Sequence, residues 1–292
     1  IKKMGLFNVY PLYDVTPVSA KGIYVYDEDN REYLDLYGGH AVISIGHGHP
    51  KYVKAITKQV AKLGFYSNAI QNPLQKQLAN KIEKLSGCKD YQLFLCNSGA
   101  EANENALKLA SFKTGKSRVI SFKNGFHGRT SAAVAATDNA TIIAPINAQQ
   151  KVTTLELNDI QGVEKELKKG DVCAVLIEFI QGVGGLDQAT AEFFEKVDAL
   201  CKANNTFFIA DEVQSGYGRS GKFFAFQHYN VTPDIISIAK GMGNGFPIGG
   251  ILIHPNIEAK FGMLGTTFGG NHLACVASLS VLNVIEEDKL MD

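Results

Sequence analysis

Two ionisable side chains stand at the ends of apolar runs, where burial is costly without a partner. Asp211 follows Phe-Phe-Ile-Ala at 207–210, and Lys240 follows Ile-Ile-Ser-Ile-Ala at 235–239. A buried charge is tolerated only when an opposite charge or a hydrogen-bonding group faces it. A carboxylate can pair with a protonated ring nitrogen, and a lysine amine can form a Schiff base with an aldehyde. The two residues therefore indicate a site for an aromatic aldehyde cofactor.

A direct salt bridge between Asp211 and Lys240 is the simpler alternative. It would need no open space, yet glycines follow the lysine at positions 241, 243, 245, 249 and 250. Glycines leave room for the close approach of something other than a side chain. We therefore favour a ligand bound between the two residues.

A candidate phosphate-binding turn lies upstream, in the sequence Asn-Ser-Gly-Ala-Glu at 97–101. Ser98 and Glu101 have the spacing of a helix-capping box, and Gly99 lets a ligand approach the backbone. The free N–H groups and the dipole of a helix N-terminus attract an anion. An ordinary cap with nothing bound is the alternative for this motif alone. Combined with the carboxylate and the lysine above, the motif predicts that Ser98, Gly99 and Ala100 hold a phosphate.

Short β-branched or aromatic runs alternate with amphipathic stretches, which predicts an α/β fold with a mostly parallel central sheet flanked by helices. The expected strands cover residues 91–95, 118–122, 172–178, 206–211 and 235–239, and the expected helices cover 101–113, 159–168 and 191–204. Ligands of open parallel sheets bind beyond the carboxyl ends of the strands, where the polar residues above are expected. Glu178 also ends such a strand, and it either orients the site or caps the strand.

The beginning and the end of the chain have a different expected organisation. Residues 22–27 and 32–36 are predicted to pair as a hairpin. We expect a small N-terminal lobe at 1–45 and a large cofactor-binding domain at 46–280. Residues 281–292 are expected to begin a linker to a small C-terminal domain that this chain lacks.

Composition narrows the class of partner and the compartment. Twenty-nine basic residues balance twenty-nine acidic ones, so no net charge favours nucleic acid or an anionic membrane. No run approaches the ~20 apolar residues of a membrane span. Five dispersed cysteines are predicted to be buried free thiols. These features indicate a cytoplasmic protein that acts on small molecules.

Three further motifs resemble ligand sites without the context those sites require. Residues 216–221 fit a dinucleotide-binding glycine pattern but start several positions beyond their strand. Residues 115–117 resemble the end of a phosphate loop, but the segment runs from helix to strand, so we expect a helix that ends at Gly115. His47 and His49 lack further ligands, so a structural turn is favoured and no metal is expected.

Five motifs carry a resemblance to the class III aminotransferases, in the acetylornithine and ornithine branch. They are NSGAEANE at 97–104, FHGRT at 126–130, DEVQSG at 211–216, AKGMG at 239–243 and GTTFGGN at 265–271. The likeness extends from Gly22 to the end of the chain. It implies the type I fold of pyridoxal-phosphate-dependent transferases, with pyridoxal 5'-phosphate attached to Lys240 as a Schiff base.

The resemblance also implies the other cofactor contacts, position by position. The backbone of the phosphate turn keeps the role inferred above. Phe126 is expected on one face of the pyridine ring and Val213 behind the ring. Asp211 is expected to pair with the ring nitrogen, and Gln214 to bond the phenolic oxygen.

Substrate contacts and assembly follow from the same resemblance. Arg129 is expected to anchor a substrate carboxylate, which suits its planar pair of donors. Thr266 is expected near the substrate, and Thr267 near the cofactor phosphate of a partner subunit. These positions imply a homodimer with shared active sites. His127, between the cofactor and substrate residues of its motif, is a further candidate for a cofactor contact.

The implied reaction moves the δ-amino group of N2-acetylornithine to 2-oxoglutarate, giving N-acetylglutamate 5-semialdehyde and glutamate, a step of arginine biosynthesis. Lys240 is expected to act as general base, which requires its pKa to fall from ~10.4. N-succinylornithine, ornithine and 4-aminobutyrate are alternative donors, and an intramolecular amino shift is an alternative reaction. A cofactor-binding fragment without turnover is the alternative of another class.

One position departs from the pattern of the resembling enzymes. Many of them carry a glutamate where this chain has Val183. In those enzymes the glutamate pairs with an arginine of the C-terminal domain while the amine donor is bound. A valine cannot form this pair, so the exchange between donor and 2-oxoglutarate is expected to be managed differently here.

Overall fold

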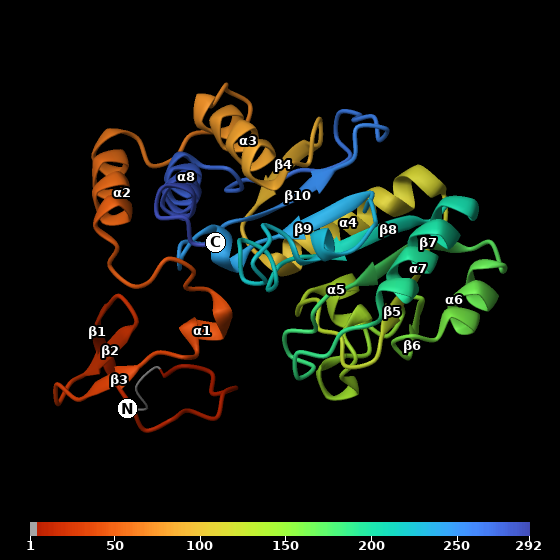
Figure 1. Cartoon of the computed structure of the whole chain (residues 1–292), viewed down its shortest axis with the longest axis horizontal. Coiled ribbons are helices and arrows are strands. Elements are labelled where there is room, and N and C mark those ends of the chain that lie inside the picture. Colours follow the sequence, from red (N-terminus) through yellow and green to blue (C-terminus); the bar gives the residue numbers. More distant parts are fainter. Residues whose placement is uncertain (1–4) are drawn as a thin grey trace.

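The computed structural model describes residues 5–292 and contains two separate sheets (Figure 1). The smaller sheet is antiparallel, in the order β1 (Pro17–Lys21), β2 (Tyr24–Asp27) and β3 (Glu32–Leu34). Strands β2 and β3 confirm the predicted hairpin. Its turn is closed by Asp27, whose Oδ1 accepts hydrogen bonds from the N–H groups of Asp29 and Arg31 at 3.0 and 2.9 Å.

The larger sheet has seven strands in the order β4-β10-β9-β8-β7-β5-β6. Their bounds are β4 (Gln92–Cys96), β5 (Arg118–Phe122), β6 (Val152–Leu155), β7 (Val172–Ile177), β8 (Phe207–Asp211), β9 (Ile235–Ile238) and β10 (Gly249–Ile253). Strands β9, β8, β7, β5 and β6 pair in parallel, whereas β10 runs antiparallel to its neighbours β4 and β9. The mostly parallel sheet expected from the sequence is confirmed.

Helices cover both faces of this sheet and explain its long apolar runs. Every residue of β5, β7, β9 and β10 is buried, as expected for strands covered on both sides. Helix α4 contacts β7, β8, β9 and β10, and α7 contacts β8 (Figure 1). Besides the short turn α1 (Gly38–Ala41), the α-helices are α2 (Pro50–Lys62), α3 (Pro73–Ser86), α4 (Gly99–Thr114), α5 (Ser131–Ala136), α6 (Ile160–Leu167), α7 (Ala191–Ala203) and α8 (His272–Glu287).

The ends of α4 confirm two predictions. Ser98 Oγ accepts a hydrogen bond from Glu101 N at 3.2 Å, so the serine caps the helix. The other half of the capping box differs, because Glu101 Oε2 accepts from Asn97 N at 2.6 Å. Gly115 ends the helix in the left-handed conformation, with φ of +70°. The motif at 115–117 is therefore a helix terminus, as expected.

Two of the glycines that follow Lys240 have a structural role that differs from the expected one. Gly249 and Gly250 begin β10. A Cβ atom would lie 2.6 Å from Ser98 O at the first position and 2.7 Å from Phe94 O at the second. They allow backbones to approach each other, so the expectation that they make room for a ligand was wrong.

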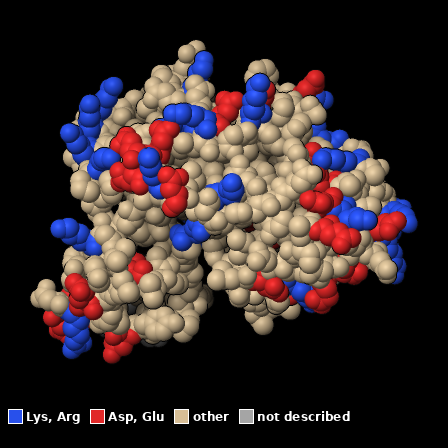
Figure 2. All heavy atoms as spheres, viewed as in Figure 1, with Lys and Arg blue, Asp and Glu red and all other residues tan. Residues whose placement is uncertain are grey.

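The cysteines, the surface charges and the lengths of the helices agree with what the composition predicted. All five cysteines are buried and free, as predicted. Figure 2 shows acidic and basic side chains interspersed over the visible face. Within residues 5–292, the helices are all too short or too polar to cross a bilayer.

Candidate active site

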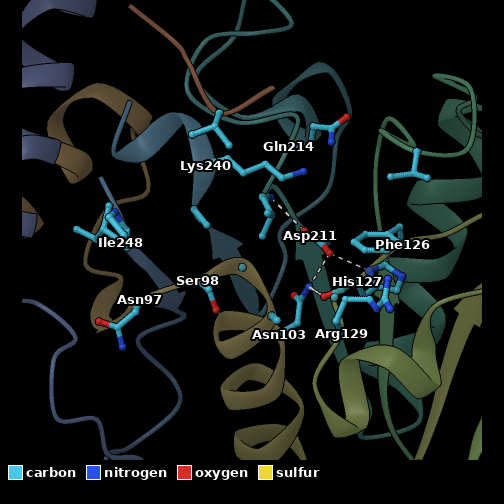
Figure 3. A pocket seen from close by; sticks show the side chains of 18 of the residues that line it. Asn97, Ser98, Asn103, Phe126, His127, Arg129, Asp211, Gln214, Lys240 and Ile248 are labelled. Carbon is cyan, nitrogen blue, oxygen red and sulfur yellow. Dashed lines mark hydrogen bonds and ion pairs between the residues drawn. The ribbon is translucent and has the colours of Figure 1, made fainter. Parts of the chain in front are cut away.

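A cavity of about 430 Å³ lies beyond the carboxyl ends of β4, β8 and β9 (Figure 3). Ten of the predicted site residues line it, namely Ser98, Gly99, Ala100, Phe126, Arg129, Glu178, Asp211, Val213, Gln214 and Lys240. They come from turns far apart in the chain. The sheet brings them together because its parallel strands end at one edge.

Asp211 ends β8 and is held on both carboxylate oxygens. Its Oδ2 accepts a hydrogen bond from Asn103 Nδ2 at 2.7 Å and lies 2.8 Å from His127 Nδ1, while Oδ1 accepts from Val213 N at 3.1 Å. Burial opposes a charge on His127, but the hydrogen bond and the charge of Asp211 outweigh it and raise the pKa of the imidazole. The carboxylate is thus fixed in orientation, and the imidazole beside it is easier to protonate than a free one (Figure 3).

Lys240 follows β9 and begins the short 3₁₀ helix η3 (Lys240–Met242). Its φ of +46° is unusual for a residue with a side chain and marks local strain. Burial lowers the pKa of its amine, while the charges of Asp211 and Glu178 act in the other direction. The neutral amine needed by a nucleophile or base is therefore easier to form than in a free lysine.

The nearest polar partner of the lysine is Gln214. With the amide turned so that its oxygen faces the lysine, Gln214 accepts from Lys240 Nζ at 2.6 Å and donates to Gly182 O at 3.2 Å. In the described part of the chain, the charged partner of Asp211 is His127 and not Lys240. The simple salt bridge considered from the sequence is therefore not formed.

The N-terminus of α4 presents two backbone donors to the cavity. Within residues 5–292, the N–H groups of Gly99 and Ala100 have no hydrogen-bond partner. A Cβ on Gly99 would lie 2.5 Å from Val213 Cγ1, so only glycine fits between the turn and this side chain. Free N–H groups at the start of a sixteen-residue helix suit an anionic group such as a phosphate.

Glu178 joins two loops on the other side of the cavity. Its Oε1 accepts from Phe126 N and its Oε2 from Gly182 N, both at 2.9 Å. Burial raises the pKa of this carboxyl group. Of the two interpretations left open by the sequence, orientation of the site agrees with this geometry, because the bonds fix the backbone beside the Phe126 ring.

Arg129 lies exposed at the rim of the cavity. Among the described residues it has no ion-pair partner. The turn that follows it is held by Glu104, whose Oε1 accepts from the N–H groups of Ala132 and Ala133 at 2.6 and 3.0 Å. The guanidinium is therefore available to an incoming anion.

Thr266 and Thr267 lie outside this cavity. Thr266 lines a separate hollow, and its Oγ1 accepts from Gly269 N at 3.0 Å. Thr267 is exposed. Asn97, which lines the cavity, donates from Nδ2 to Thr266 Oγ1 at 3.5 Å, so Thr266 lies beside the cavity without lining it. The expected roles of both threonines remain predictions, and that of Thr267 requires a second subunit.

Several residues of the site were not predicted from the sequence. Asn103 was missed, although a polar residue one turn after Gly99 on the buried face of α4 is a usable signal. His127 was named as a candidate for touching a cofactor, whereas the structure gives it contact with Asp211. Val42 and Ile248 also line the cavity, and no local pattern marks them.

The chemistry of these groups fits one compact cofactor. The site offers a primary amine, a carboxylate held by a histidine and an asparagine, an aromatic ring and two free backbone donors. Pyridoxal phosphate has an aldehyde, a basic ring nitrogen, a flat ring and a phosphate, one for each of these features.

Comparison with known sequences agrees with this chemistry. The model of the family described as "Aminotransferase class-III" matches residues 8–292. An acetylornithine aminotransferase of Bacillus subtilis is 41% identical over 96% of this chain and 73% of that one. The acetylornithine aminotransferase of Caldanaerobacter subterraneus is 43% identical over 100% of this chain and 75% of that one.

Solved structures share the fold over nearly the whole chain. An ornithine aminotransferase from Toxoplasma gondii, described with partial occupancy of pyridoxal phosphate at its active site, has a TM-score of 0.90 and 30% identity. The match covers 97% of this chain and 69% of that one. A taurine:2-oxoglutarate aminotransferase from Bifidobacterium kashiwanohense, in complex with pyridoxal phosphate and glutamate, has a TM-score of 0.89 and 26% identity over 98% and 71% of the two chains.

Proposed function

The chain belongs to the class III aminotransferases, and we propose that it moves the δ-amino group of N2-acetylornithine to 2-oxoglutarate through pyridoxal phosphate. The products are N-acetylglutamate 5-semialdehyde and glutamate. The observation that carries the proposal is that one cavity is lined by Lys240, by Asp211 with its carboxylate held in place, and by the unbonded N–H groups at the start of α4. The similarity to acetylornithine aminotransferases over nearly the whole chain supports this donor.

Each part of the cavity would hold one part of the cofactor. The N–H groups of Gly99 and Ala100, with Ser98, would hold the phosphate, and Asp211 the ring nitrogen. Phe126 and Val213 would enclose the ring, and Gln214 would bond its phenolic oxygen. Glu178 would keep Phe126 in place. When bound, the cofactor supplies an aldehyde for amine exchange and a ring that withdraws electrons from the substrate carbon.

Lys240 has two tasks in this proposal. It would hold the cofactor covalently between turnovers and, once an amine donor has replaced it, move a proton with its Nζ atom as general base. Burial supports the second task, since it lowers the pKa of the amine. Asp211, held by His127 and Asn103, would stabilise a proton on the ring nitrogen.

The donor is recognised by its carboxylate and by the shape of the cavity. Arg129 would bind the carboxylate at the rim, and Thr266 would lie near the substrate. Val183 lines the cavity and is 63% exposed. Because a valine cannot pair with an arginine, it would not mask a second carboxylate site during donor binding. The donors N-succinylornithine, ornithine and 4-aminobutyrate therefore belong in any test of specificity.

A donor screen tests the proposal. Protein saturated with pyridoxal phosphate is mixed with each of the four donors and 2-oxoglutarate, and glutamate is measured. We expect acetylornithine to have the highest kcat/KM. Another preferred donor would overturn the substrate assignment, and bound cofactor without turnover would favour an inert fragment. Repeated turnover of a donor without 2-oxoglutarate, beyond the single equivalent per cofactor that the first half-reaction gives, would instead indicate an intramolecular amino shift.

We also propose that the protein works as a homodimer in the cytoplasm. Thr267 would then reach the cofactor phosphate of the partner subunit, which agrees with its exposed position outside the cavity of its own chain. Sedimentation of the cofactor-saturated protein at micromolar concentration measures the assembly. A monomer with full activity would contradict the shared site.

A further inference from the structure

A single buried asparagine connects two segments about 200 residues apart in the sequence. Asn244 Oδ1 accepts hydrogen bonds from Ser44 N at 2.8 Å and Ile45 N at 3.1 Å, and its Nδ2 donates to Gly46 O at 3.0 Å. The residue is 7% exposed. It joins residues 240–246, which we call the lysine loop, to residues 41–46, which we call the wall segment.

Other polar contacts hold the wall segment at further points. Ser44 Oγ donates to Gly241 O at 2.7 Å, one residue after Lys240. The guanidinium of Arg219 donates to Ala41 O at 2.6 Å and to Ile43 O at 3.1 Å. The wall segment thus has backbone or side-chain bonds to neighbouring loops at nearly every residue.

The chain enters the wall segment through an unfavourable turn. The helical turn α1 (Gly38–Ala41) has φ of 55°, 57°, 62° and 59° at its four residues, so it is left-handed. This conformation is costly for His40 and Ala41, which carry a Cβ atom. Such a turn persists only where surrounding contacts hold it. Arg219, which donates to Ala41 O, and Asp35, whose Oδ1 accepts from Gly38 N at 2.7 Å, hold the turn itself, and Asn244 holds the residues that follow it.

The residue between the clamped positions lines the active-site cavity. Val42 lies between Ala41 and Ile43, whose carbonyl groups Arg219 binds, and its side chain faces the cavity that Lys240 also lines. The lysine loop and the residues just after it contribute Gly245, Phe246, Pro247 and Ile248 to the same cavity. Two surfaces of the cavity therefore depend on one set of hydrogen bonds.

We propose that Asn244 is a positioning residue that locks the wall segment to the lysine loop, and that Val42, held in this way, is a specificity-determining residue that limits the size of the amine donor. The proposal rests on the proposed aminotransferase function. Its physical basis is rigidity, because a side chain on a clamped backbone excludes a bulkier donor, whereas one on a loose backbone moves aside.

The conformation of Asn244 allows a clean test of the lock. Its φ of +48° is left-handed, so Asn244→Gly removes the side chain without straining the backbone. Asn205 provides a matched control, since it has the same φ of +48° and is exposed. Within residues 5–292 the Asn205 side chain makes no hydrogen bond. Asn205→Gly therefore repeats the backbone change without the loss of a contact.

Amide hydrogen exchange measures the lock independently of activity. In Asn244→Gly, the amides of Ser44 and Ile45 lose their shared acceptor, and we expect their exchange to accelerate by about tenfold or more. Asn205→Gly should leave both amides unchanged. Ser44→Ala removes only the bond to Gly241 O and is the less disruptive variant to use if Asn244→Gly folds poorly. It should accelerate exchange at Ile45 by a smaller factor.

Steady-state kinetics measure the consequence for the donor. We expect Asn244→Gly to raise the KM of the preferred donor by about tenfold while kcat stays within about threefold, because binding is lost more than chemistry. Val42→Ala should raise kcat/KM for a donor with a bulkier acyl group by about tenfold relative to the preferred donor. The exchange rates of Val42→Ala should match the wild type.

Two results would overturn the proposal. Unchanged exchange at Ser44 and Ile45 in Asn244→Gly would show that the asparagine does not lock the segment. Accelerated exchange with unchanged donor KM and selectivity would show that the segment is not a wall of the donor site. If the wild-type protein transfers no amino group, the proposed function fails, whereas the exchange experiment still decides whether the lock exists.

Discussion

The imidazole of His127 lies 2.8 Å from the carboxylate of Asp211, and both side chains are buried at the end of β8. This contact gives the carboxylate a hydrogen-bonding partner other than Lys240. The carboxylate is therefore stabilised without the lysine, and the lysine amine remains available for chemistry. Because His127 is the partner of Asp211 and Lys240 is left for chemistry, Asp211 and Lys240 form no ion pair within the described chain.

The first prediction concerns this pair. His127→Gln keeps an amide donor but removes the cation, and we expect kcat/KM to fall about tenfold at pH 6, where the cation is present, since charge-assisted hydrogen bonds are roughly twice as strong as neutral ones. The pKa of His127 is raised in the folded protein, so the cation is present below ~6.5 and is lost as the pH rises through the higher folded value. Wild-type activity should show an alkaline loss that the variant lacks. An identical alkaline limb in both proteins would refute this role.

The second prediction concerns Lys240. In Lys240→Ala we expect kcat to fall by at least about 10³-fold, because both covalent attachment and the general base are lost. Borohydride reduction followed by mass spectrometry should find the cofactor attached to the wild type and not to the variant. Lys222→Ala, at an exposed position in a neighbouring loop, is the control and should behave as the wild type. Attachment at another lysine would contradict the assignment.

The elements that the sequence predicted best are those with a local cause. A parallel strand buried on both faces must be a continuous apolar run, so β5 and β7 were recognisable within a residue of their bounds. A cap and a terminal glycine likewise mark α4 within a few residues. Strand β10 was missed because its two leading glycines, which permit close packing between strands, look the same as glycines that make room for a ligand.

The parts of the site that could not be predicted depend on contacts between distant residues. Asn103 and Asp211 are 108 positions apart, and Ser44 and Asn244 are 200 apart. No periodicity or spacing within one segment reports such a contact. The expected role of Thr267 depends on a second subunit, which lies outside the information in one chain.

The third prediction concerns the turn that carries Arg129. In Glu104→Ala the N–H groups of Ala132 and Ala133 lose their acceptor, so the turn after the arginine loosens. We expect the KM of the donor to rise about tenfold, with cofactor affinity within about twofold of the wild type, since only the carboxylate anchor is displaced. Titration with pyridoxal phosphate and steady-state kinetics separate the two effects.

Two variants sharpen this test. Glu104→Gln keeps one acceptor oxygen and should show a smaller rise in KM. Glu195→Ala removes an exposed glutamate of α7 that has no hydrogen-bond or ion-pair partner among residues 5–292, and should leave the KM unchanged. Loss of cofactor affinity in Glu104→Ala without a change in donor KM would count against the proposed route to Arg129.

The fourth prediction concerns Glu212, which follows Asp211 and is fully buried. Its carboxylate accepts from Ser215 Oγ at 2.6 Å and from the N–H groups of Ala225 and Phe226 at 3.0 and 2.8 Å. Burial raises its pKa from 4.5 to about 7, although these hydrogen bonds oppose the rise. A raised folded-state pKa contributes stability that is fully present below pH 4.5 and is lost as the pH rises through about 7.

Glu212→Gln removes this dependence on pH because an amide does not titrate in this range. Between pH 5 and pH 8 the free energy of unfolding of the variant should rise relative to that of the wild type, by at most ~3 kcal/mol for a shift of this size. This change does not depend on how stable the variant is at pH 5. Urea unfolding at both pH values measures the gain. Glu286→Gln is the control, because its hydrogen bonds to Lys81 and Lys84 lower the pKa of Glu286 to about 2, so it is ionised throughout the interval. An equal change in both variants would mean that the Glu212 carboxyl does not titrate between pH 5 and 8, and that its hydrogen bonds outweigh the effect of burial.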